Sequence, residues 1–567
     1  MSAIELRPPE LVMKLDRMGS FHQCRLSFMR TLLRRMKSEA WVFERPRFDI
    51  DDNGVGTALY SARVPPTEPG ESARTYTLVA FAHDLPDDMR SDRVIATAWD
   101  TTFALHDGVP TEADIERLRA NVPLQEAGRV SGRELTLSRA NRSVRLWSKV
   151  VGALAAGKQP DAETVESVGY LMRTTAVYGS GKFGAADRQS IEDRPEFLAP
   201  FQAEMLTVFL IRTFVMDLVE HMARQASPDA AVLDPALRRR FGIGNSTGLG
   251  MAPFLITHPR LINNWIAARE EALARVRAVD RATDAEIAMF RSFVTRAERG
   301  VARWHSEHEI QQAKLVELAA DVDALLDRLA EQDLTADRPW DALVRWAHDS
   351  LTLEGQELVV SLVLEPYGHL IDDLTDHMHA DESSLGAIDG AMTVAELRPA
   401  IERQYDWALG IDWSEPRADA RAWYVSEEKL EPRLGERHEE PIADYEQPLQ
   451  PGRDAARLHA DLVAWDDGAT VAEVLRTHPE HRHTVRRLLL VADSPYGEIR
   501  DNTIDAEMLP IDLLRSKLSF FGATDFDPRS DRWVRITMFR GAPFPHELGE
   551  LDPDTWTYPD LVDGSTA

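Results

Sequence analysis

Residues 241–259 read FGIGNSTGLGMAPFLITHP and lie between two long apolar segments. Glycine lets the backbone adopt positive φ and pass close to another group, while Asn, Ser and Thr supply short hydrogen-bonding side chains. A loop of this composition that opens onto a helix can gather backbone N–H groups around an anion. A tight packing turn between two core helices is the alternative explanation. We predict a ligand-binding loop, and its candidate ligand contacts are Gly244, Asn245, Ser246, Thr247 and His258.

A second glycine-rich stretch, GSGKFG at residues 179–184, formally matches the G-x-G-x-x-G pattern. A dinucleotide-binding loop needs a strand before it and a packed helix after it. We expect a helix before Gly179 and find no helix-packing stripe after Gly184, so that interpretation fails. One explanation that remains is a helix C-cap with Lys182 near the carbonyl end. The other is an anion contact through Lys182, joined by Arg173 from the preceding helix. Our central hypothesis is that the two glycine-rich loops meet and form one polar pocket.

The composition limits the class of protein. A chain of 567 residues exceeds one ordinary core, so we expect two to four domains. Its 94 Asp and Glu outnumber its 65 Lys and Arg, which gives a formal net charge of −29. A field of that sign repels phosphate backbones and anionic lipids, so we expect neither nucleic acid nor a membrane as partner. Cys24 is the only cysteine, which excludes an intramolecular disulfide and a multi-cysteine metal cluster. Without a run of about 18 uncharged apolar residues, we expect a soluble cytoplasmic protein.

The order of apolar residues predicts a mainly α protein with an N-terminal α+β portion that contains a small antiparallel sheet. From Trp41 four segments resemble strands separated by turn signals, and the absence of helices between them favours an antiparallel meander. From about Thr111 helical spacing dominates, including residues 160–172. The predicted domains are an N-terminal α+β domain (1–121), a large helical core domain with both glycine-rich loops (122–412), an extended arm or linker (413–454) and a C-terminal mixed helical segment (455–567).

A third candidate site is DSPYGEIRDNTID at residues 493–505, where reactive side chains are dense. General acid/base catalysis by Glu498 or Tyr496, with Arg500 orienting an anionic group, would suit such a loop. The alternative is an ion-paired loop in which Asp501 or Asn502 caps the next helix.

Three groups of His and carboxylate residues were considered as metal sites. His305 and Glu309 have the i,i+4 spacing of a shared ligand pair but lack a second histidine. Residues 372–376 read DDLTD, an acidic pattern that favours a solvated helix end because no second acidic motif faces it. His481 and His483 lie among arginines, which indicates a basic surface patch. We therefore predict no metal site, and the cofactor is left unassigned.

Two functions from different classes fit these residues. The first is binding of a small anionic metabolite by a cytoplasmic protein, in the form of an acid/base enzyme without a tightly bound organic cofactor. The second is a non-catalytic helical assembly or adaptor protein. In that case residues 413–454 would dock on a partner or on a second copy of the chain, giving a homo-oligomer.

Overall fold

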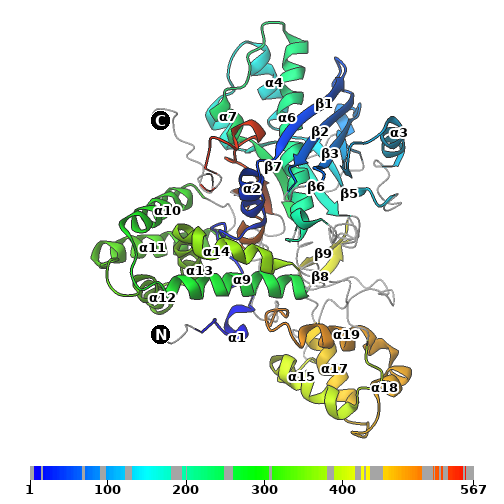
Figure 1. Ribbon diagram of the computed structural model, residues 1–567, viewed down its shortest axis with the longest axis vertical. Helices are drawn as coiled ribbons and strands as arrows, with labels where there is room; N and C mark the ends of the chain where they lie inside the picture. Colours follow the sequence, from blue (N-terminus) through cyan, green and yellow to red (C-terminus); the bar gives the residue numbers. More distant parts are fainter. Residues whose placement is uncertain are drawn as a thin grey trace. The chain divides into compact units, whose positions relative to one another are not determined.

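The computed structural model describes most of the chain and divides it into two compact units, each discontinuous in sequence (Figure 1). The helical unit comprises Met1–Ser20, Gly248–Asp284 and Gln332–Ser516, and the sheet unit comprises Phe21–Thr247, Ala285–Glu331 and Lys517–Ala567. The described residues are 5–14, 17–66, 70–89, 98–121, 131–179, 194–199, 201–247, 259–304, 309–379, 388–414, 423–426, 429–434, 451–500, 515, 518–522, 525–527, 534–552, 554 and 556. The domain boundaries from the sequence stay a prediction.

The sheet unit is built on one nine-stranded sheet with the order β1-β2-β3-β4-β5-β6-β7-β11-β10. Neighbouring strands are antiparallel, apart from the parallel pair β6 and β7. The strands are β1 (Val42–Ile50), β2 (Gly56–Val64), β3 (Arg74–Ala82), β4 (Thr101–Asp107), β5 (Glu134–Arg142), β6 (Tyr170–Gly179), β7 (Gly242–Thr247), β10 (Asp525–Asp527) and β11 (Val534–Met538).

The predicted fold class is therefore wrong, because the sheet is large and mixed rather than small and antiparallel. The meander of four strands is present as β1 to β4, but the sheet continues through the region expected to be helical. Within residues 160–172, helix α5 (Ala162–Glu166) ends early and β6 begins at Tyr170. The residues of β6, YLMRTTAVYG, are rich in β-branched and aromatic side chains, which favour strands. That local preference prevailed over the helical spacing of the apolar positions.

Helices cover both faces of this sheet, as the alternation of side chains along each strand shows. On one face Tyr60 and Phe103 make edge-on ring contacts with Phe214 of α6 (Gln202–Ala226). On the other face the alternate positions Leu59, Val79, Phe81, Ala104 and Leu137 pack with Ile115 and Leu118 of α3 (Glu112–Asn121). The remaining α-helices of this unit are α2 (Phe28–Ser38), α4 (Trp147–Ala155), α5, α7 (Pro235–Arg240), α10 (Asp284–Arg303) and α11 (Glu309–Glu331).

The helical unit contains two groups of helices. The first group is α1 (Pro9–Val12), α9 (Pro259–Arg277), α12 (Pro339–Ser350), α13 (Leu353–Val363) and α14 (Gly368–Ile371). Helix α13 ends just before Pro366, which lies in a short 3-10 turn. The second group shares one apolar core and consists of α15 (Val394–Leu409), α17 (Pro451–Leu462), α18 (Val471–Thr477) and α19 (Arg482–Val491). An isolated bridge between Thr393 and Thr470 joins the starts of α15 and α18.

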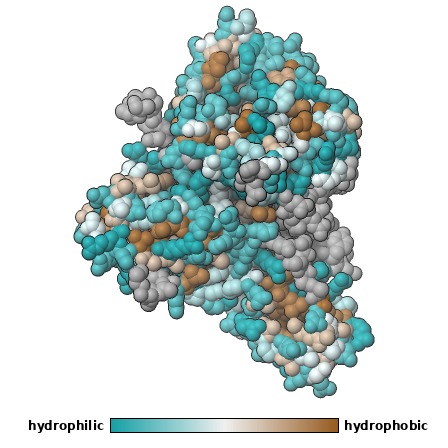
Figure 2. All heavy atoms as spheres, in the orientation of Figure 1, coloured by the Kyte–Doolittle hydropathy of each residue, from teal (hydrophilic) through white to brown (hydrophobic). Residues whose placement is uncertain are grey.

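Residues 413–454, predicted as an arm or linker, are described only in part. Two short strands, β8 (Trp423–Ser426) and β9 (Lys429–Leu434), pair antiparallel. Docking of this segment on a partner stays a prediction. Figure 2 shows hydrophilic residues over most of the viewed face, with hydrophobic residues in small groups among them. Among the described residues, the apolar side chains with the greatest exposed fractions include Val109, Val232, Val316 and Val463.

Candidate functional site

The two glycine-rich stretches begin on neighbouring strands of the sheet unit. Gly179 ends β6, residues 242–247 form β7, and the two strands run parallel with Arg173 opposite Gly244. The described parts of both stretches therefore reach the carboxyl ends of adjacent strands, where α/β proteins commonly bind ligands. Lys182 and His258 lie outside the described residues, as do residues 248–250. Convergence of the two loops stays a prediction.

Arg173 and Asn245 are buried in the sheet at this strand pair, with 2% and 7% of their surface exposed. The side-chain amide of Asn245 donates to Thr174 Oγ1 at 3.1 Å. Ser246 and Thr247 continue β7, and their side chains lie outside the described part of the chain. The strand pair thus brings Asn245 together with Thr174, whereas Arg173, the neighbouring residue on β6, has its side chain on the opposite face of the sheet.

The expectation of a turn between two helices at residues 242–247 is wrong, because Gly242 and Gly244 lie within a strand. A Cβ on Gly242 would lie 2.3 Å from the Met538 carbonyl oxygen, and one on Gly244 would lie 2.7 Å from the Tyr170 ring. Both glycines are therefore required by close packing between β7 and its neighbouring strands.

The expectation of a helix before GSGKFG is also wrong, because the strand β6 precedes it. The strand that a dinucleotide-binding loop requires is therefore present. Residues 180–193 lie outside the described residues, and α6 begins only at Gln202.

The residues predicted to be catalytic lie in the helical unit, and the structure gives each an internal partner. Glu498 is 3% exposed and accepts two hydrogen bonds from Arg487, at 2.7 and 2.8 Å. The Tyr405 hydroxyl donates to the same carboxylate at 2.6 Å. Burial and the adjacent Glu498 carboxylate raise the pKa of Tyr405 well above its ordinary value, so this phenol stays protonated.

Tyr496 and Arg500 connect this loop to the N-terminal segment of the same unit. The Tyr496 hydroxyl donates to the Arg7 carbonyl oxygen at 2.7 Å, and burial raises the pKa of Tyr496 to about 12. Arg500 donates to Glu10 at 2.7 Å, and its backbone N–H donates to the Met13 carbonyl at 2.8 Å. These contacts agree with the ion-paired part of the alternative to catalysis, whereas Asp501 and Asn502, the predicted helix caps, lie outside the described residues.

A cavity that sequence reasoning missed lies in the sheet unit where β5 passes into α4. Its volume is about 380 Å³, within the usual range of small-molecule sites. The residues that line it are Asp87, Arg142, Ser143, Val144, Trp147 and Ser148. Strand β5 ends at Arg142, and after four intervening residues α4 begins with Trp147, whose N–H donates to the Ser143 carbonyl at 3.0 Å.

The Arg142 side chain is held in a defined position at this cavity. Its guanidinium lies 4.8 Å from the centre of the Trp147 ring, a cation–π arrangement. Asp100 lies on the strand side, where its carboxylate accepts the Arg142 backbone N–H at 2.9 Å and lies 3.8 Å from Nε. Gly54, in the turn between β1 and β2, lies close to the Arg142 guanidinium, because a Cβ on Gly54 would be 3.1 Å from Arg142 Nη2.

Two further features make the cavity suitable for an anion. Helix α4 starts without a side-chain cap, and although the Trp147 N–H donates to the Ser143 carbonyl, the start of the helix presents the positive end of its dipole. Ser143 is 2% exposed, and its hydroxyl has no hydrogen-bond partner among the described residues. A buried hydroxyl without a partner costs about 1–3 kcal/mol, which a bound acceptor would offset. In the sequence, this site is marked by Arg142 at the end of a strand and by Ser143 directly after it. The helix that follows has no capping side chain at its N-cap position.

A group that could hold a metal ion is present in the helical unit. It consists of Asp461, His478, Glu480 and His481.

Comparison of the chain with family models, curated proteins and solved structures gives no match. Among the described residues, no helix combines the length and the apolar character that crossing a membrane requires.

Proposed function

We propose that the protein binds a small anionic metabolite in the cavity between β5 and α4. The observation that carries this proposal is the placement of three anion-binding groups around one cavity: the Arg142 guanidinium, Ser143 and the uncapped start of α4. Guanidinium groups and helix N-termini bind carboxylates and phosphates through charge-assisted hydrogen bonds. The Trp147 ring offers an apolar surface for the rest of the ligand.

Asp87 gives this cavity a polar group of opposite sign, which suits a ligand that also carries a hydroxyl or ammonium group. A cytoplasmic location remains part of the proposal. The adaptor function depends on residues 413–454 and stays a prediction.

Arg142→Gln tests this proposal, and Arg139→Gln is its matched control. Arg139 lies on the same strand and also stacks on a tryptophan, with its guanidinium 5.2 Å from the Trp99 ring. Purified variants would be screened by thermal shift against phosphorylated and carboxylated metabolites, and hits would be measured by calorimetry. Because a charge-assisted hydrogen bond contributes about 1.5–3 kcal/mol, Arg142→Gln should weaken binding roughly 10- to 100-fold.

Arg139→Gln should retain the affinity of the wild type. Equal affinity in both variants, or no ligand for the wild type, would remove the proposal. Lys182→Ala is a third variant in the test. If it abolishes binding of a ligand that Arg142→Gln still binds, that ligand binds at the glycine-rich stretches instead.

A further inference from the structure

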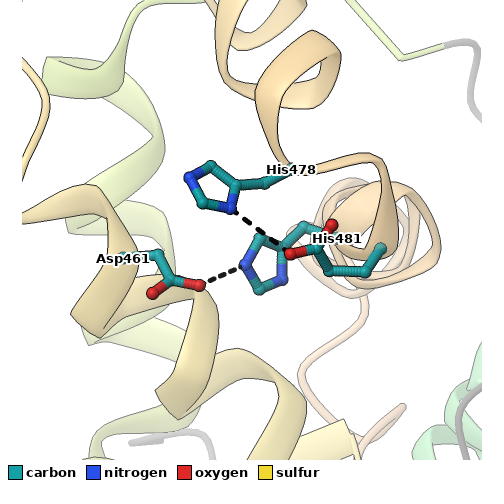
Figure 3. A group of neighbouring side chains, drawn as sticks. Asp461, His478 and His481 are labelled. Carbon is teal, nitrogen blue, oxygen red and sulfur yellow. Dashed lines mark hydrogen bonds and ion pairs between the residues drawn. The ribbon is translucent and has the colours of Figure 1, made fainter.

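The connection between α18 and α19 presents two histidines on one side of a tight turn. The sequence His478-Pro479-Glu480-His481 forms a 3-10 turn, in which residues three apart lie one above the other. The two imidazole ring centres are accordingly 5.8 Å apart. Figure 3 shows both rings on the side of the turn that faces α17.

Helix α17 adds a carboxylate to this group. Asp461 Oδ2 lies 2.7 Å from His481 Nε2, and Glu480 Oε1 lies 3.3 Å from His478 Nδ1 (Figure 3). One ligand atom from each of the four residues lies within 4.8 Å of all the others. In a tetrahedral site with ligand bonds of about 2.0–2.2 Å, neighbouring ligand atoms are roughly 3.4 Å apart. Forming the site would therefore shorten the longest of these separations by up to about 1.4 Å and lengthen the 2.7 Å contact between Asp461 and His481.

One member of this group is buried among the surrounding helices, and the other three are partly exposed to solvent. The His481 side chain is only 3% exposed, whereas those of Asp461, His478 and Glu480 are 34%, 31% and 47% exposed. Asp461 precedes Leu462, a fully buried residue of the core shared by α15, α17, α18 and α19. The buried His481 is thus held in place, while the exposed side chains can move by the distance that binding requires and an ion can enter from solvent.

We propose that Asp461, His478, Glu480 and His481 form a site for a divalent transition metal, with Zn²⁺ as the best fit. Two imidazoles and two carboxylates suit Zn²⁺ and its neighbours, whereas Mg²⁺ and Ca²⁺ prefer ligand sets made only of oxygen. Four protein ligands complete a tetrahedral shell, so the role of the ion is structural. It joins α17 to the turn between α18 and α19, and it stabilises this four-helix group when bound.

The test uses the full-length protein, stripped of metal with a chelator and then titrated with Zn²⁺ by calorimetry. We expect one tightly bound Zn²⁺ per chain and a higher melting temperature. Co²⁺ in its place should give the intense visible absorption of tetrahedral coordination, and Mg²⁺ should leave the melting temperature unchanged.

His481→Ala and Glu480→Gln should each weaken Zn²⁺ binding at least about tenfold, because loss of a direct ligand exceeds the loss of an outer partner. Glu480→Gln changes an exposed side chain, so it keeps the test valid even if His481→Ala unfolds. The matched control is His459→Ala. His459 lies on α17 outside the proposed metal site, and its Nε2 is 3.1 Å from a carboxylate oxygen of Glu402. Absence of Zn²⁺ binding, or equal binding by all three variants, would show that these residues form only His–carboxylate hydrogen bonds.

Discussion

Replacing Glu498 by alanine should locally unfold the four-helix group of the helical unit. Glu498 and Arg487 form a buried ion pair, with 4% and 5% of their side chains exposed. Removing one partner leaves an uncompensated buried charge, which costs about 3–5 kcal/mol. The Tyr405 hydroxyl would lose its acceptor in the same step. We therefore expect the stability of α15 and α19 to fall by that amount.

Hydrogen exchange measured by mass spectrometry suits this prediction, because it reports each helix separately in a chain with two compact units. A loss of 3–5 kcal/mol corresponds to exchange roughly 150- to 5,000-fold faster in peptides from α15 and α19. The matched control is Asp467→Asn, which breaks the exposed pair of Asp467 with Arg398 at 2.8 Å. That pair should contribute less than about 1 kcal/mol.

Replacing both partners of the ion pair separates the cost of an unpaired buried charge from the cost of losing the charges themselves. Arg487→Met combined with Glu498→Leu replaces the ion pair by apolar side chains of similar length, and it should cost less than either single change to alanine. Unchanged exchange in Glu498→Ala would refute the structural role of this pair. In that event the catalytic role predicted for Glu498 would become the better explanation.

Two further predictions concern the sheet unit. Gly244→Ala places a Cβ 2.7 Å from the Tyr170 ring and should destabilise the sheet by about 1–3 kcal/mol, measurable as a lower urea midpoint; an unchanged midpoint would contradict the packing argument. Burial raises the pKa of Asp554, but the nearby charges of Arg34 and Arg30 outweigh it, so the pKa of Asp554 is lowered overall. Its contribution to stability is therefore complete above the unfolded pKa of about 4 and is lost as the pH falls below that value. Asp554→Asn should reduce the acid dependence of the melting temperature, and identical pH profiles would disprove this linkage.

The sequence predicted the first four strands, each of which pairs with its neighbour in the chain. Strands β1 to β4 follow one another without an α-helix among the described residues, so alternation and turn residues were sufficient to find them. Strand β7 was missed because its residues, GIGNST, have little strand preference. Its glycines are explained by Tyr170 and by the backbone of β11, contacts that depend on residues far away in the sequence.

The residues of the candidate sites could not be grouped from the sequence, also because their contacts join separate segments. Arg142, Ser143 and Trp147 are close in sequence, but the cavity also needs Asp87 from a separate segment. His481 was noticed among its basic neighbours, while its partner Asp461 lies 20 residues earlier on helix α17, with α18 between them. In each case the sequence supplied the chemical groups, and the tertiary fold decided which of them meet.

The position of β11 next to β7 has a consequence for synthesis of the chain on the ribosome. Strand β7 pairs with β6 on one side and with residues 534–538 on the other, which are translated almost 300 residues later. Until those residues emerge, one backbone edge of β7 lacks its final partner, and an open strand edge is a template for pairing with other chains. The nascent protein therefore passes through a long aggregation-prone interval during which chaperones would protect it.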